Sequence, residues 1–274
     1  MGVEGGLGDI QLRTVWTLAR CSHPEPVVMV TAVCGVLALL AGRGWGTAWV
    51  VLAVLAGQLF VGWTNDYVDR RRDADAKRTD KPLARGEISP RLVATAAAVA
   101  GVAAVPLSLA SGIAATAVHL VGISSATAYN LGLKSTLLSV VTYALSFAMI
   151  PAFITLGLAH PHWPPAWVTA AASLTGIGGH FAQARPDVER DRRQRILGLP
   201  QLVGDRASGL LAALFLVAGA AVISIGARTF LPLVVVVPAL GVAVAPPAPA
   251  FRFTLVTAGV TVVAFVASAG TALR

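Results

Sequence analysis

The sequence predicts an all-α integral membrane protein with about nine transmembrane helices. Of its 274 residues, 56% are hydrophobic and only 12% are charged, and the mean hydropathy is +0.74. A soluble globular protein carries about 25% charged residues, so a water-soluble fold is excluded. Apolar windows of membrane-spanning length recur along the whole chain. They leave no room for a large soluble domain, so we expect a single transmembrane domain over residues 1–274.

Nine apolar windows are the candidate helices. Each approaches the length of about 20 apolar residues that a helical span needs. All the charged residues fall outside the windows. In chain order the windows are Val27–Gly42, Thr47–Thr64, Leu92–Ala110, Gly112–Tyr129, Thr136–Gly157, Pro165–Ala184, Ala207–Ala227, Thr229–Ala245 and Phe253–Gly270.

The distribution of charge tests this number of windows. If nine helices alternate across the bilayer, the N-terminus and the loops after the second, fourth, sixth and eighth windows share one side. That side carries all 13 acidic residues and all of the 21 Lys and Arg residues except Arg43, Arg228 and Arg274. A miscounted helix would mix the two sides, and basic loops face the cytoplasm. The nine-span topology and a cytoplasmic N-terminus are therefore predicted together.

Composition also excludes two classes of function. The net charge of +8 is what basic cytoplasmic loops produce, so we expect no nucleic-acid partner. Cys21 and Cys34 are the only cysteines, which excludes a disulfide framework and a CxxC metal site. No pattern in the sequence indicates a protein partner.

Most of the acidic residues fall in two blocks, Trp63–Ser89 and Gln183–Gly204. Each block follows an apolar window, and the two lie four helices apart at corresponding helix ends. Acidic residues follow no strong rule of sidedness in membrane proteins. Their segregation therefore indicates a chemical site.

Helical geometry groups the carboxylates of the first block. If the second window continues as a helix through Asp73, one face carries an amide and three carboxylates. These residues are Asn65, Asp66, Asp69 and Asp73, whereas Asp75 falls on another face.

The second block repeats the pattern. Asp187 and Asp191 lie about 40° apart on a helix, with His180 on the same face. Glu189 points away from that face. Carboxylates grouped this closely repel one another unless a cation joins them, and hard oxygen ligands suit Mg²⁺, which commonly shares its coordination with a substrate phosphate.

Basic residues beside the carboxylates favour a diphosphate ligand, because Lys77, Arg78, Lys81 and Lys134 supply charge to phosphate oxygens. Within a membrane protein, this combination predicts a substrate with a diphosphate head and an apolar tail. The alternative is that the carboxylates only neutralise neighbouring arginines. We interpret Arg70–Arg72 and Arg192–Arg193 as charges that face solvent or lipid headgroups.

Longer motifs now indicate a family. The first block reads Asn65-Asp66-x-x-Asp69-x-x-x-Asp73, followed by Arg78-Thr79, Lys81-Pro82-Leu83 and Gly86. It closely resembles the first signature of the UbiA superfamily of intramembrane prenyltransferases. The second block, Asp187-x-x-x-Asp191-Arg192 with Leu199-Pro200 and Gly204, resembles the second signature, and Tyr129 with Lys134 resembles a short motif between them. The resemblance implies a ring of nine helices around a central cavity, Mg²⁺ as cofactor and an isoprenyl diphosphate donor.

The chain departs from the family pattern at several positions. Gln183-Ala184 stands where the second signature often has Asn-Asp, and Lys81 and Arg195 stand where arginine and glycine are common. Ser135 follows Lys134, where several members that prenylate aromatic acids carry a basic residue. The resemblance also implies a lid over the cavity, for which residues 80–90 are the candidate.

We therefore interpret the chain as a prenyltransferase that moves an isoprenyl group from a prenyl diphosphate to a lipophilic or aromatic acceptor. Mg²⁺ is expected to assist ionisation of the diphosphate. The residues expected to bind metal and to act in catalysis are Asp66, Asp69, Asp73, Asp187 and Asp191, with Lys134 as a further catalytic group. The residues expected to bind substrate are Asn65, Arg78, Lys81, Tyr129, Gln183 and His180.

Three aromatic side chains, Trp63, Tyr67 and Tyr129, are candidates to stabilise an allylic cation through their ring faces. His119 is expected to form a hydrogen bond between helices.

Two alternatives stay open. A terpene cyclase would use the same ionisation but trap the cation with the chain's own double bonds. The second alternative is a cation-binding transporter. A transporter would be expected to carry its charged residues near the membrane midplane rather than at one face. The localisation expected is a bacterial cytoplasmic membrane, with the site open to the cytoplasm.

Overall fold

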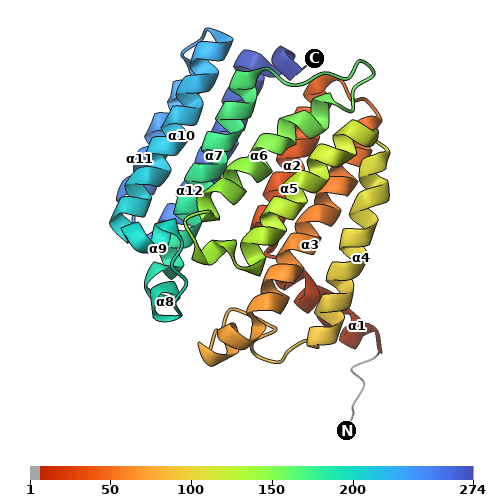
Figure 1. Ribbon diagram of the computed structural model, residues 1–274, viewed down its shortest axis with the longest axis vertical. Coiled ribbons are helices and arrows are strands. Elements are labelled where there is room, and N and C mark those ends of the chain that lie inside the picture. Colours follow the sequence, from red (N-terminus) through yellow and green to blue (C-terminus); the bar gives the residue numbers. More distant parts are fainter. Residues whose placement is uncertain (1–6, 274) are drawn as a thin grey trace.

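The computed structural model describes residues 7–273, so residues 1–6 and 274 of the expected domain lie outside the described residues. The described chain is a bundle of helices (Figure 1). The longer helices are α1 (Leu7–Arg20), α2 (Pro24–Ala41), α3 (Gly46–Asp75), α4 (Pro90–Leu109), α5 (Ile113–Leu131), α6 (Ser139–Thr155), α7 (Ala166–Ala184), α10 (Asp205–Ala227), α11 (Val236–Val244) and α12 (Pro247–Ala269). The short elements are α8 (Val188–Arg193), α9 (Leu199–Val203) and the 3₁₀ turns Leu133–Ser135, Arg185–Asp187, Leu231–Val235 and Gly270–Leu273.

Each of the nine predicted windows coincides with a helix, which confirms the all-α fold class. Within the described residues, 4 helices are long and apolar enough to cross a membrane by themselves, namely α2, α3, α4 and α10. Shorter apolar helices cover Ser139–Thr155, Leu231–Val244 and Val256–Ala267. The chain is a multi-pass membrane protein, while nine crossings stay a prediction.

Helix α3 positions the first acidic block. Its 30 residues span about 45 Å at 1.5 Å per residue. That length exceeds a hydrocarbon core of about 30 Å, so the acidic end extends beyond the apolar region. The helix continues past Asp73 as predicted, and Asp66, Asp69 and Asp73 all lie on its buried face.

The second block is less regular than a single helix. Helix α7 ends at Ala184, a 3₁₀ turn covers Arg185–Asp187, and α8 begins at Val188. Pro186 explains the break, because its ring nitrogen has no hydrogen to donate to the preceding turn. Helices α8 and α9 lie at the same end of the bundle as the acidic end of α3 (Figure 1), so the two blocks face one another as predicted.

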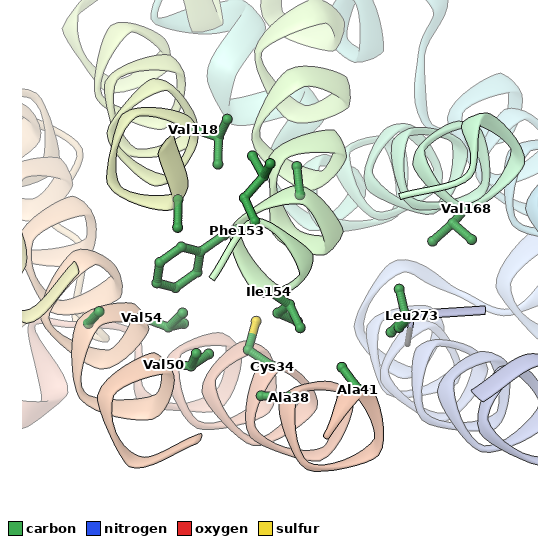
Figure 2. Close-up of a cluster of buried hydrophobic side chains, with 14 of the residues drawn as sticks. Cys34, Ala38, Ala41, Val50, Val54, Val118, Phe153, Ile154, Val168 and Leu273 are labelled. Carbon is green, nitrogen blue, oxygen red and sulfur yellow. The ribbon is translucent and has the colours of Figure 1, made fainter. Parts of the chain in front are cut away.

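The largest buried cluster lies near the other end of the bundle. Cys34 and Ala38 of α2, Val54 of α3 and Phe153 and Ile154 of α6 all belong to it (Figure 2). The C-terminal 3₁₀ turn packs into the same cluster through Leu273. Because this core fills the bundle there, a cavity entered at the acidic end closes against it.

Helix α1 is an element that the apolar windows missed. It is amphipathic, and its Leu12, Val15 and Trp16 side chains are exposed. An exposed apolar face beside basic residues is typical of a helix lying on a membrane surface. Such a helix has too few consecutive apolar residues to be read as a span.

Candidate active site

A cavity of about 490 Å³ enters the bundle between the two acidic blocks. It is lined by α2, α3, α5, α6, α7 and the second block. Its mouth is polar and its interior is mostly apolar. All the predicted site residues line it except Asp66, which lies directly behind the wall and pairs with Lys81.

Asp66 is 2% exposed and is held by two partners. Lys81 from the loop after α3 forms an ion pair with its Oδ1 atom, and His23 Nε2 lies 3.0 Å from the same oxygen. The other oxygen, Oδ2, is buried without a hydrogen-bond partner among the described residues. Asp66 therefore anchors the loop after α3 while one of its lone-pair positions stays free.

Asp69 is paired with Lys134. Lys134 Nζ lies 2.6 Å from both carboxylate oxygens of Asp69, and the lysine is only 8% exposed. Burial lowers the pKa of Lys134, and the Asp69 carboxylate opposes that shift. Arg72 Nη2 contacts Asp69 as well, at 2.7 Å. Arg72 thus lines the cavity, and its interpretation as a charge that faces solvent or lipid headgroups was wrong.

Arg78 joins the two acidic blocks. Its Nε atom donates to Asp80 at 2.7 Å, and its Nη1 atom lies 3.7 Å from Asp187 Oδ2. The Asp80 carboxylate, followed by Asp187, raises the pKa of the Arg78 guanidinium. A permanently charged guanidinium therefore spans the mouth of the cavity, where a phosphate would enter.

Asp73 and Asp191 have fewer charged or hydrogen-bonding partners than the other aspartates that were predicted to bind metal. Asp73 lines the cavity, and its carboxylate makes no hydrogen bond or ion pair within residues 7–273. Asp191 accepts one hydrogen bond, at 2.8 Å from Gln201 Nε2. Burial, and then repulsion from Asp187, raises the pKa of Asp191. A cation placed between these groups would remove that repulsion. Glu189 is 73% exposed and points away, as predicted.

An aromatic cluster forms one wall of the cavity. Tyr129 meets Tyr143 edge-on at 5.2 Å between ring centroids, and His180 stacks on Tyr143 at 4.5 Å. His180 Nε2 lies 3.2 Å from Ser139 Oγ, and Gln183 accepts a hydrogen bond from the Tyr143 hydroxyl at 2.9 Å. These rings line the cavity, and the faces of aromatic rings attract positive charge.

Trp63 and Tyr67, two of the aromatic residues predicted to stabilise an allylic cation, do not line the cavity. Trp63 donates a hydrogen bond to the Leu18 carbonyl at 2.9 Å. Trp63 and Tyr67 pack against a small cluster that includes Leu83, away from the cavity lining. They therefore hold the loop after α3 in place and do not face a reacting group.

Sequence reasoning missed three polar residues of the site. His23 has a left-handed backbone (φ 58°) immediately before Pro24, and only the tertiary fold brings it to Asp66. Asn130 binds Asn65 at 3.0 Å and lies beside Tyr129 in the short motif, which was the available signal for it. Gln201 lies within the second block, but its contact with Asp191 depends on the turn before α9.

Comparison with known proteins identifies the family. A model of the UbiA prenyltransferase family matches residues 28–254, which include both acidic blocks. The chain belongs to this family. No curated protein sequence matches it.

Solved UbiA-family folds superpose on nearly the whole chain. A digeranylgeranylglyceryl phosphate synthase aligns with a TM-score of 0.67 at 14% identity, covering 94% of this chain and 99% of that one. A UbiA homolog from Archaeoglobus fulgidus, bound to GPP and Mg²⁺, aligns with a TM-score of 0.67 at 15% identity, covering 91% and 98%. The same homolog bound to DMAPP and Mg²⁺ gives 16% identity and the same TM-score. At these identities the likeness establishes the UbiA fold alone.

The donor set of this UbiA-family chain suits a divalent cation. No three acidic, histidine or cysteine side chains among the described residues form a preformed metal cage. Mg²⁺ does not require one, since it usually binds one or two carboxylates, several waters and substrate phosphates. The Asp73 and Asp191 carboxylates, which line the cavity, are oxygen ligands of the required kind. The residues present therefore fit the cofactor that the sequence resemblance implied.

Proposed function

We propose that this chain transfers an isoprenyl group from a prenyl diphosphate to a lipophilic or aromatic acceptor within the membrane. The observation that carries the proposal is the cavity itself. Facing carboxylates and cations lie at its mouth, and apolar side chains of α2, α3, α5 and α6 line its interior. A prenyl diphosphate matches this arrangement, because its diphosphate head is charged and its hydrocarbon tail is apolar.

Asp69, Asp73, Asp187 and Asp191 are proposed to hold Mg²⁺ together with the substrate diphosphate, with Asp66 as a further ligand through Oδ2. Bound Mg²⁺ would supply the positive charge that draws electrons from the breaking carbon–oxygen bond. Arg78, Lys81, Arg72 and Lys134 surround the same space and neutralise the departing diphosphate.

The bond between C1 of the prenyl chain and the diphosphate oxygen breaks, and its electron pair leaves with the diphosphate. The resulting allylic cation lies beside Tyr129, Tyr143 and His180, whose ring faces stabilise it. An electron-rich acceptor then bonds to C1 and releases a proton. Residues 80–90 are proposed to exclude water. Lys81 and Leu83 of that segment are buried against the bundle.

We place the cavity mouth on the cytoplasmic side of a bacterial cytoplasmic membrane. Helices α8 and α9 and the acidic end of α3 share one end of the bundle (Figure 1), and this end carries most of the basic residues of the chain.

The test is product analysis with purified protein, Mg²⁺ and geranyl, farnesyl or geranylgeranyl diphosphate. We expect diphosphate release that EDTA abolishes, and a prenylated product when lipophilic or aromatic acceptors are added. A cyclic terpene formed without an acceptor would replace the transferase with a cyclase. No diphosphate release with any donor, with or without acceptors, would refute both and favour a transporter. The cavity's closure against the buried core, at Cys34, Val54 and Phe153, argues against a transport path.

A further inference from the structure

The interior of the cavity follows one face of α3. Its lining residues on that helix recur every three or four positions from the acidic end inward. They are Asp73, Arg72, Asp69, Asn65, Gly62, Val61, Gln58, Gly57 and Val54. Residues at this spacing form a continuous stripe along a helix, so the cavity is a channel parallel to α3.

The far end of the channel is closed by the buried core. Cys34, Val54 and Phe153 line the cavity and also belong to the main hydrophobic cluster. The Phe153 ring projects from α6 towards α3, beside Val54 (Figure 2). Packed side chains leave few voids larger than a water molecule, so a ligand tail has to end at this floor.

A line of contacts braces the floor. His119 stacks on Phe153 with 4.3 Å between ring centroids and an interplanar angle of 13°. Its Nδ1 atom lies 2.7 Å from Ser108 Oγ, and that hydroxyl donates to the Ala104 carbonyl at 2.6 Å. Because the single hydroxyl hydrogen is used there, His119 Nδ1 is the donor to Ser108. This bond joins α4 to α5, as expected for His119, and fixes the ring against Phe153.

The depth of the channel follows from helix geometry. Asn65 of α3 and Asn130 of α5 are joined by a hydrogen bond at the inner edge of the polar mouth. Val54 lies eleven residues from Asn65, and His119 lies eleven residues from Asn130. At 1.5 Å per residue, both helices give about 16 Å from the polar level to the floor.

That depth limits the length of the hydrocarbon. Three backbone bonds of an extended chain span about 3.5 Å, so a four-bond isoprene unit spans about 4.7 Å by the same geometry. Three units reach about 14 Å and fill the channel. Two units reach about 9 Å and leave about two-fifths of the channel empty, and four reach about 19 Å, beyond the floor.

We infer that the channel selects a prenyl diphosphate of three isoprene units, with Val54 and Phe153 setting the limit and His119 holding Phe153 in position. The inference rests on the proposed function, because it concerns the tail of the same substrate. Apolar burial favours each added unit until the floor is reached. A longer chain then has to fold or displace packed side chains.

The test measures kcat/KM for diphosphate release from donors of five, ten, fifteen and twenty carbons, with Mg²⁺. We expect the wild-type value to be highest at fifteen carbons, at least tenfold above ten and above twenty. Phe153→Ala is expected to move the optimum to twenty carbons, and Val54→Phe to ten. Ser108→Ala is expected to reduce discrimination against the twenty-carbon donor, since it frees His119 while leaving the lining unchanged.

Two matched controls separate channel length from general packing. Phe60→Ala removes a ring that packs near Gly101 between α3 and α4, and Leu52→Phe adds one on an exposed face of α3. Both should keep the fifteen-carbon optimum. Release from every donor without a preference, or an optimum that neither Phe153→Ala nor Val54→Phe moves, would overturn the inference while leaving the proposed function intact. No release from any donor would instead refute the proposed function.

Discussion

Replacement of Lys134 tests the electrostatic core of the site. Its Nζ atom contacts both oxygens of Asp69 at 2.6 Å in an almost fully buried position. Lys134→Met keeps much of the hydrophobic stem and removes the charge. Removing one preorganised group that stabilises charge in a transition state costs about 3 kcal/mol, which is a rate loss of about 100-fold. We expect kcat for diphosphate release to fall by that factor, with a smaller change in KM.

The matched control is Lys77→Met. Lys77 was expected from the sequence to supply charge to the phosphate, but the structure places it exposed and outside the cavity lining. We expect its kcat to stay within twofold of wild type. Steady-state release of diphosphate from a prenyl donor, at saturating Mg²⁺, gives both parameters. Circular dichroism of each variant confirms that the helices are retained. If Lys134→Met retained kcat within about fivefold, or if Lys77→Met were equally impaired, the assignment of Lys134 to the leaving group would be refuted.

Four other predictions follow from the geometry. Asp191→Ala should abolish diphosphate release while Glu189→Ala stays near wild type, because Asp191 lines the cavity and Glu189 is exposed; equal loss in both would contradict the facing-carboxylate geometry. Gly198→Ala should reduce kcat and thermal stability, since an added Cβ would lie 2.3 Å from the Lys134 carbonyl oxygen, whereas Gly179→Ala meets no atom within 4 Å and should be neutral in melting and activity assays. Reporter fusions after Ser89 and Gly204 should both read as cytoplasmic and one after Pro161 as external; a split between the first two would refute the topology. Arg78 lowers the pKa of the Asp80 carboxyl to about 2. The ion pair should therefore stabilise the fold fully above pH 3.8 and lose that effect as the pH falls towards 2. A carboxyl NMR titration of Asp80 with a midpoint near 3.8 would contradict the pairing.

The long-range features of the fold were predictable because they depend on period and charge. Apolar windows located the helices, and the spacing of Asp66, Asp69 and Asp73 predicted the buried face of α3 that the structure confirms. The same reasoning placed Asp187 and Asp191 opposite that face. Pro186 breaks the helix between His180 and these two aspartates. The prediction still holds for the aspartates, because both carboxylates lie at the cavity mouth.

Features set by tertiary contacts were not predictable from the sequence. Arg72 was interpreted as a charge that faces solvent or lipid headgroups because it lies in a run of three arginines, and only the fold brings it within 2.7 Å of Asp69. Trp63 and Tyr67 have the chemistry of cation-stabilising residues, but their position on α3 directs them to a packing cluster. His23 reaches Asp66 through a loop between α1 and α2, and α1 itself was hidden because it is amphipathic and short.

The most direct test of the central claim is an experimental structure of the protein with an unreactive thio-analogue of farnesyl diphosphate and Mn²⁺ in place of Mg²⁺. Anomalous scattering locates the metal independently of the ligand. We predict metal and diphosphate between Asp69 and Asp73 on one side and Asp187 and Asp191 on the other, with the tail directed along α3 towards Phe153. A diphosphate bound outside this cavity, or metal bound without contact to either pair of aspartates, would contradict the account.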